Sequence, residues 1–458
     1  MIFAVQIFAS SGTNAFVVSI AGDRLSIDAN QIPLQDILTR LVEQGLTVRI
    51  DRSINPRITA SFRDRELREG LSSIIKPLDH AFVWKTVKGP IKSFVRIEEI
   101  HVFLPGKMGL IRQLQSESGR VVVRNPEDGS LYLKDEILFR LRPGLTLSDF
   151  NRILRKVKGT VVEGNDLSGI YKIRLVENSD IPSLIKGMAD YPGIADAEPN
   201  YAYPVSPDFR YIRKTGSGTA FSISSDIPLK ETSAPVAVID TGLARGSGIE
   251  EYVIASLDVL NPEEPVSDSL GHGTQMALIA AGVVKPYGLK KNLDGRNSII
   301  PIKAFDDGGY VSSFDMMSSL DFAIQKGARV LNLSWGSEIR SDFLEQDLNY
   351  AASRGLIIVA SAGNEPTGIP VYPAAFRSVI GVGALGPDGN PWERSNFGDF
   401  VMVQAPGFAS LPVGYKGDPG IYAGTSIASA FTSYLISDYL SENPNATTKE
   451  ILNALEKY

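Results

Sequence analysis

The 458-residue sequence predicts an α/β fold class, in which a parallel-sheet domain with helices on both faces follows two small α+β domains. A chain of this length holds about three domains. Its C-terminal half repeats short, nearly continuous apolar runs separated by helical patterns, which is typical of strands buried on both faces. Its N-terminal half instead alternates apolar and polar residues between amphipathic helices, as α+β domains do.

The composition is that of a globular protein and excludes several kinds of function. Hydrophobic residues make up 43% of the chain, so sizeable cores can be buried. The chain has no cysteine, which excludes disulfides, thiol catalysis and thiolate metal sites. Its net charge of −6 argues against a nucleic-acid partner, which normally requires a basic excess. No apolar run approaches the roughly 18 residues of a membrane span.

Composition and turn signals divide the chain into six segments. They are a possible truncated signal peptide (1–15), an α+β domain (16–105), a linker (106–134), a ferredoxin-like domain (135–203), a linker and possible processing region (204–234) and an α/β domain (235–458). The first segment is apolar, but no Lys or Arg precedes Arg24, so a clipped signal peptide and a buried first strand both stay open.

The domain at 16–105 shows two amphipathic helices and several strands. The predicted helices cover 33–46 and 66–78, and the predicted strands cover 47–54, 57–64, 80–87 and 93–104. The stretch IDANQIPLQDILTRLVEQGLTVRID resembles the secretin and TonB short N-terminal domain of bacterial envelope proteins. This resemblance implies a docking module in a Gram-negative envelope, and therefore an exported protein, periplasmic or extracellular.

The domain at 135–203 has the pattern of a split βαββαβ unit. Its first helix begins near Ser148, which is a plausible N-cap. Its end, GIADAEPNY, resembles the end of the inhibitory propeptide of subtilisin-like proteases, whose tail lies in the active-site cleft. An unrelated ferredoxin-like domain is the alternative. The Ser/Gly/Pro-rich segment that follows suggests self-cleavage between about 201 and 234, although proline disfavours the Tyr203–Pro204 bond.

The α/β domain carries polar motifs at the ends of its predicted strands, where parallel sheets bind their ligands. Each motif alone has an ordinary structural explanation as a turn or a helix start. They are Asp240-Thr241-Gly242, Gly271-His272-Gly273-Thr274, Gly363-Asn364-Glu365 and Gly424-Thr425-Ser426. Together they place a carboxylate, a lone imidazole, an amide and a helix-start hydroxyl at one edge of the sheet.

The motifs VAVIDTGL, GHGT, VLNLSWGS, VASAGN and AGTSIAS, in this order, resemble the subtilisin-like serine proteases over essentially all of 235–458. The resemblance implies that Ser426 is the nucleophile, His272 the general base and Asp240 the group that orients the imidazole. It also implies an oxyanion hole formed by Asn364 and the backbone N–H of Ser426. The segments implied to flank a substrate are Ser334, Trp335, Gly336, Ser361, Ala362 and Gly363.

Other enzyme classes lack their required residues. An α/β-hydrolase needs a histidine after its serine and a Gly-x-Ser-x-Gly motif, but no histidine follows Ser426 and Ala428 stands in the last motif position. A zincin needs His-Glu-x-x-His, which is absent. A dinucleotide motif at Gly381-x-Gly383-x-x-Gly386 is followed by PDGNP, which breaks a helix instead of starting one.

The sequence departs from the family pattern in small ways. Ala430 stands where the family usually has proline, but alanine is a strong helix former, so the helix is expected to survive. Gln275 stands where a histidine is common. The short segment 283–297 leaves little room for the calcium loop of many relatives. No cofactor is therefore required, no metal ligand is assigned, and calcium stays possible without support.

The sequence thus predicts an exported serine endopeptidase made as a precursor, with its own propeptide as intramolecular inhibitor. Its partners would be a polypeptide substrate and an envelope protein that docks to the first domain. The rival hypothesis is a catalytically silent pseudoprotease or an envelope docking protein, held shut by its propeptide. The complete set of Asp240, His272, Ser426 and Asn364 counts against it, because a binding protein has no need of all four.

Overall fold

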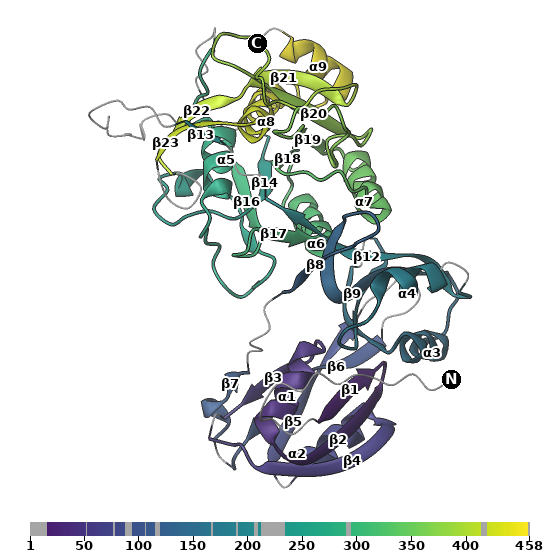
Figure 1. The fold of residues 1–458 in the computed structure, drawn as a ribbon. Helices are drawn as coiled ribbons and strands as arrows, with labels where there is room; N and C mark the ends of the chain where they lie inside the picture. The colour runs from purple at the N-terminus through teal and green to yellow at the C-terminus, as the bar shows by residue number, and fades with distance from the viewer. Residues whose placement is uncertain are drawn as a thin grey trace. The chain divides into compact units, whose positions relative to one another are not determined.

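The structure is a computed structural model that describes two compact units (Figure 1). The described residues are 16–51, 53–76, 78–87, 94–105, 107–114, 120–165, 168–188, 191–205, 209–211, 234–289, 295–413 and 419–456. The first unit holds the described residues up to Val123 together with Leu133–Asn200, and the second holds Arg124–Tyr132 and those from Tyr201 onward. The predicted signal peptide (1–15) and most of the predicted processing region lie outside the described residues.

The N-terminal part of the first unit consists of two small sheets and two helices around one apolar core. Its elements are β1 (Val17–Ala21), β2 (Arg24–Pro33), α1 (Leu34–Glu43), β3 (Thr47–Ile50), β4 (Arg57–Glu66), α2 (Leu67–Ile75), β5 (Asp79–Val87), β6 (Phe94–Phe103), a 3₁₀ turn (Met108–Leu110) and β7 (Arg112–Gln113). The strand orders are β1-β2-β4 and β5-β6-β3-β7. Both helices are shorter than predicted, and the core is formed by Leu, Ile and Val from helices and strands alike.

The second part of the first unit confirms the predicted βαββαβ order. Its elements are β9 (Leu131–Leu141), α3 (Leu147–Val157), β10 (Gly159–Asn165), β11 (Ile170–Leu175), α4 (Ile181–Met188) and β12 (Ile194–Pro204), with β8 (Val122–Arg124) beside β9. The strand order β10-β11-β9-β12 is that of a ferredoxin-like sheet. The prediction of Ser148 as the N-cap is wrong: Thr146 caps α3 in a reciprocal capping box with Asp149, which places Ser148 inside the first turn.

A seven-stranded parallel sheet forms the centre of the second unit, as predicted. Its strands, in spatial order, are β15 (Leu257–Asp258), β16 (Ile299–Lys303), β14 (Val236–Asp240), β18 (Val330–Leu333), β19 (Ile357–Ser361), β20 (Val379–Leu385) and β21 (Val401–Pro406). All six pairs of neighbours run parallel. The carboxyl ends of β14, β18 and β19 therefore lie at one edge, where the predicted motifs begin.

Helices cover both faces of this sheet and bury a separate core on each side. One core packs α5 (His272–Ala280) and α8 (Thr425–Glu442) against the sheet, and the other packs α6 (Ser313–Gln325) and α7 (Asp342–Ser353). Alternate residues of β14 enter opposite cores, as a strand buried on both faces requires. The remaining elements are a 3₁₀ turn (Glu250–Tyr252), β13 (Phe209–Tyr211), β17 (Tyr310–Ser312), β22 (Phe408–Leu411), β23 (Gly420–Ala423) and α9 (Thr448–Leu455). None of the helices in the described part of the chain is long and apolar enough to span a membrane.

Candidate active site

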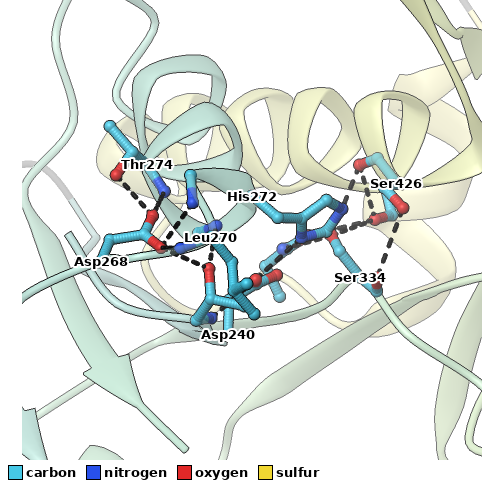
Figure 2. A network of polar contacts seen from close by, with 12 residues as sticks. Asp240, Asp268, Leu270, His272, Thr274, Ser334 and Ser426 are labelled. Carbon is cyan, nitrogen blue, oxygen red and sulfur yellow. Dashed lines mark hydrogen bonds and ion pairs between the residues drawn. The ribbon is translucent and has the colours of Figure 1, made fainter. Parts of the chain in front are cut away.

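The structure brings Asp240 and His272 together from two different elements (Figure 2). Asp240 is the last residue of β14, and His272 is the first residue of α5. The His272 Nδ1–H donates to Asp240 Oδ1 at 2.8 Å, and both side chains are at most 1% exposed. In the neutral ring, this bond makes Nδ1 the protonated nitrogen and leaves Nε2 as the basic one. The pair therefore fixes both the orientation and the tautomer of the imidazole.

Two glycines allow the turn after β14 to approach the start of α5. Gly242 has a φ of 117°, and a Cβ there would lie 2.0 Å from the carbonyl oxygen of Ser267. A Cβ on Gly273 would lie 2.4 Å from the carbonyl oxygen of Gly242. A side chain on Gly242 would displace the loop at Ser267, and one on Gly273 would push the start of α5 away from the turn after β14. Glycine at both positions is thus a condition for the contact between Asp240 and His272.

Asp268 organises the loop that carries His272, and the sequence reasoning missed it. One carboxylate oxygen, Oδ1, accepts from the Thr241 hydroxyl at 2.9 Å and from the Gly271 N–H at 2.7 Å. The other oxygen, Oδ2, accepts from the Thr274 N–H at 2.9 Å and from its hydroxyl at 2.6 Å. Asp268 therefore links the β14 turn to the first turn of α5. An aspartate just ahead of a predicted helix was the available signal.

Ser426 lies at the start of α8, on the other side of the imidazole from Asp240 (Figure 2). It is 1% exposed, and its Oγ donates to the carbonyl oxygen of Ser334 at 3.3 Å. The first intrahelical bond runs from the Ala428 N–H to Gly424, so the Ser426 N–H belongs to the unpaired donors of the helix start. Helix α8 continues unbroken through Ala430, as predicted for alanine in place of proline.

Asn364 follows β19 and contacts the residue before Ser426. Its Oδ1 accepts from both the N–H and the hydroxyl of Thr425, each at 2.9 Å. Because Oδ1 already accepts two hydrogen bonds, the Nδ2 group of Asn364 is the end of the amide that can donate one. The side chain is only partly buried, and it is anchored on the residue directly before Ser426.

The segment Ser334–Gly336 lies directly after β18 and contacts residues from the end of β12. Val205 forms an antiparallel bridge with Trp335, and the Tyr203 ring packs on the Trp335 ring at 4.9 Å. On the other side, Ala202–Pro204 pairs antiparallel with β17, and the Val205 N–H donates to Gly309 at 2.8 Å. The end of β12 therefore lies as an added strand between β17 and Trp335. The sequence reasoning missed β17, because three residues carry no readable period.

The second predicted flanking segment is arranged differently. Ser361 and Ala362 are buried, and the Ala362 N–H donates to Val382 of β20 at 2.9 Å. The Gly363 N–H donates to the Thr425 hydroxyl at 3.2 Å. These backbone groups brace the Asn364 turn against the start of α8, which positions the amide.

The other chemical alternatives find no structural support among the described residues. Within that part of the chain, no group of three or more His, Asp or Glu side chains could hold a metal ion, and we assign no residue to a calcium site. Strand β20 ends in a turn at its Gly-x-Gly-x-x-Gly sequence, and no helix follows it to bind a dinucleotide phosphate. Gln275 is buried in α5, and its Nε2 donates to the carbonyl of Val413 at 2.7 Å.

Comparison with known proteins identifies two matching families and several relatives. Residues 232–457 match the model of the subtilase family, and residues 119–200 match that of the fervidolysin N-terminal prodomain. The chain is 27% identical over 332 residues to the thermophilic serine proteinase of Bacillus sp. (strain AK1), covering 71% of this chain and 82% of that protein. It is 31% identical over 232 residues to subtilisin Savinase of Lederbergia lenta, covering 50% of this chain and 84% of that protein.

A solved structure extends the likeness to the N-terminal half. Fervidolysin from Fervidobacterium pennivorans, a keratinolytic enzyme related to subtilisin, matches with a TM-score of 0.57 and 26% identity. The match covers 75% of this chain and 60% of the fervidolysin chain. The parallel-sheet fold, the family match and the relatives together show that the chain belongs to the subtilase family. It is a subtilisin-like serine protease, which is a hydrolase, and it has a fervidolysin-like prodomain.

Proposed function

We propose that the chain is a serine endopeptidase that acts through Asp240, His272 and Ser426 and is made as a precursor inhibited by its own prodomain segment. The observation that carries the proposal is the buried bond between Asp240 and His272, with the imidazole between Asp240 and Ser426 (Figure 2). This is the arrangement that activates a serine hydroxyl by an adjacent, oriented base. No metal or organic cofactor enters the proposed reaction.

The proposed reaction divides peptide hydrolysis into two steps. Ser426 Oγ attacks the carbonyl carbon of the scissile bond while His272 Nε2 takes the hydroxyl proton. When the tetrahedral intermediate collapses, the C–N bond breaks, and His272 returns the proton to the leaving amine. Water then attacks the acyl-enzyme by the same route, and the proton it gives to His272 returns to Ser426. Asp240 stabilises the imidazolium through the 2.8 Å bond without becoming protonated.

Asn364 and the Ser426 N–H form the proposed oxyanion hole. Both are donors, one from a side-chain amide anchored on Thr425 and one from the first turn of α8. Their partial positive charge favours the oxygen that becomes negative in the intermediate. Because Thr425 holds Asn364 in place before any substrate binds, these donors need little reorganisation during the reaction.

The end of β12 supports the proposal that the precursor is inhibited by its own chain. An extended peptide that adds a strand to an exposed edge is how proteases of this kind hold their substrates. Tyr203 and Val205 occupy that edge at Trp335, and Tyr203 is 1% exposed. We propose that a substrate enters only when these residues leave, and that Trp335 and Gly336 then contact it.

Processing and docking complete the proposal. We propose self-cleavage between about 201 and 234, at a bond other than Tyr203–Pro204, and mass spectrometry of the purified chain decides whether it occurs. An intact but fully active chain would exclude this idea. We further propose that residues 16–105 dock an exported protein to a partner in a bacterial envelope. A pull-down from envelope extracts with and without these residues tests that role.

Fluorophosphonate labelling tests the enzymatic proposal directly. This probe reacts with an activated serine, so the wild-type chain should be labelled and the Ser426→Ala variant should not. Ser437→Ala is the matched control, because Ser437 lies on the same helix and donates to Ala234, away from Ser426. Equal absence of labelling in wild type and Ser426→Ala, even after limited trimming of residues 1–230, would instead support the pseudoprotease.

A further inference from the structure

A buried amide lies beneath the proposed nucleophile. Asn332 is on β18, a central strand of the parallel sheet that pairs with β14 and β19. Its neighbours Leu331 and Leu333 enter the α6–α7 core, so Asn332 points to the α8 face. That face is otherwise apolar, formed by residues such as Val330 and Val359. A fully buried amide in such a place is costly unless its hydrogen bonds are satisfied.

Asn332 satisfies its amide with serines. Its Nδ2 donates to Ser334 Oγ at 2.8 Å. Its Oδ1 accepts from Ser429 and from Ser433, each at 3.2 Å. Both of these serines lie on α8, one helical turn apart, and all four side chains are buried. The amide therefore joins the end of β18 to one face of α8.

Two of these serines also contact the backbone of Ser426. Ser429 Oγ lies 3.0 Å from the Ser426 carbonyl oxygen, and Ser334 Oγ lies 3.4 Å from it. In return, Ser426 Oγ donates to the Ser334 carbonyl oxygen at 3.3 Å. The strand end and the helix start are thus bonded reciprocally (Figure 2). The remaining contact, 3.1 Å between the two serine oxygens, closes the network.

The amide also sets the direction of the hydrogen bonds. Because Asn332 donates to Ser334 Oγ, the single proton of Ser334 must point elsewhere, toward Ser426 or Ser429. Ser429 likewise has a single proton, which it donates either to Asn332 Oδ1 or to the Ser426 carbonyl oxygen. The Ser426 carbonyl therefore accepts from Ser334 or from Ser429, and Asn332 contacts both of these serines. Leucine provides neither a donor nor an acceptor, and a carboxylate provides no donor. Asparagine supplies both from one buried side chain.

We propose that Asn332 is a positioning residue: through Ser334 and Ser429 it holds the Ser426 carbonyl, and with it the first turn of α8. That turn carries both the Ser426 hydroxyl and the N–H of the proposed oxyanion hole. The inference rests on the proposed function, since it takes Ser426 to be the nucleophile. Asn332 touches no substrate, and its effect reaches the reaction only through the placement of Ser426.

The test measures how fast a fluorophosphonate reacts with Ser426 in full-length variants. Labelling at several probe concentrations separates the inactivation rate kinact from the probe affinity Ki, and thermal unfolding gives the stability. Asn332→Leu and Ser429→Ala should lower kinact on the order of 10- to 100-fold and leave Ki unchanged, because the reacting atom is misplaced while the site is kept. Ser437→Ala, a buried serine of α8 outside the network, should lower stability without changing kinact.

The double variant makes the route itself testable. If Asn332 acts through Ser429, Asn332→Leu with Ser429→Ala should lower kinact by less than the product of the two single effects. The inference is overturned if the kinact values of Asn332→Leu and Ser429→Ala equal that of Ser437→Ala. Should Asn332→Leu fail to fold, Ser429→Ala carries the test alone. If wild type reacts no faster than Ser426→Ala, the proposed function itself fails, which is a different outcome.

Discussion

Asp240 is the residue whose surroundings say most about its role. Strand-end aspartates are common turn formers, and Asp258 is one of them here: its carboxylate accepts from the N–H groups of Leu260 and Asn261. Asp240 also accepts from its following residue, Thr241, but in addition it receives the imidazole N–H. Both aspartates are buried at strand ends of the same sheet, with β16 between their strands, but only Asp240 receives an imidazole N–H.

This difference gives a matched pair of variants. Asp240→Asn should lower kcat by about 10⁴-fold, because the amide no longer selects the required imidazole tautomer. Asp258→Asn should leave kcat unchanged, since its carboxylate only closes a turn. Steady-state kinetics on a peptide substrate measures both, after limited trimming of residues 1–230 with an added protease, because Asp240→Asn would also slow the proposed self-cleavage. A similar kcat for the two variants would contradict the assigned role of Asp240.

Asn364 permits an equally narrow change. Asn364→Asp keeps the oxygen that accepts from Thr425 but replaces the donating Nδ2 group with a second oxygen. We expect kcat to fall by about 10²–10³-fold with little change in KM, the size of effect for which subtilisin itself is the established example. Thermal unfolding of the same samples should show that the Thr425 contacts persist. An unchanged kcat would remove Asn364 from the oxyanion hole.

At the scale of elements, the sequence predicts the long, periodic parts of the fold and misses the short ones. The runs that became β14, β18 and β19 are apolar throughout because both faces are buried. Strands β15 and β17 have two and three residues, too few to show a period. The motifs of the site could be predicted because each is a short continuous stretch of sequence. The Asn332 network could not, because it depends on which strand packs against which helix.

In the proposed precursor, the end of β12 is the segment that limits access to Ser426. Tyr203→Ala removes the ring that packs on Trp335 and should raise the labelling rate of the unprocessed precursor by on the order of 10-fold. Tyr203→Phe is the control, because it removes the hydroxyl that contacts Ser313 at 3.1 Å and keeps the ring. If Tyr203→Ala is labelled no faster than wild type, the β12 segment does not limit access to Ser426.

At the scale of the whole molecule, the first unit contains a buried carboxylate, Glu136, that makes its stability depend on pH. Glu136 of β9 is buried in the first unit, where it pairs with Arg174 and accepts from Asn200 at 2.7 Å. Burial alone would raise its pKa, but the charges of Arg174, Lys172 and Arg120 outweigh it and hold the pKa below the usual range. The ionised form is therefore favoured in the folded first unit.

A carboxyl group whose folded pKa is lowered stabilises the fold above its ordinary pKa of about 4.3, and that stability is lost as the pH falls further. We expect the first unit to lose stability below about pH 4, and Glu136→Gln to reduce this pH dependence. At neutral pH the same variant should cost about 2–3 kcal/mol, because Arg174 loses its buried partner. Hydrogen exchange of β9 and β11 across this pH range measures both effects. A wild-type acid response in Glu136→Gln would contradict the assignment.

The Tyr203 ring packs on the Trp335 ring, so a residue of the proposed inhibitory segment contacts a residue of the proposed substrate site. If Trp335 contacts the substrate, a substitution of Trp335 changes the substrate specificity of the protease. The same substitution changes how tightly the β12 segment inhibits the proposed precursor. A variant selected for a new substrate would then be active before its prodomain segment is removed, or the segment would not dissociate. A change of specificity at Trp335 therefore requires a compensating substitution at Tyr203, so that inhibition is kept.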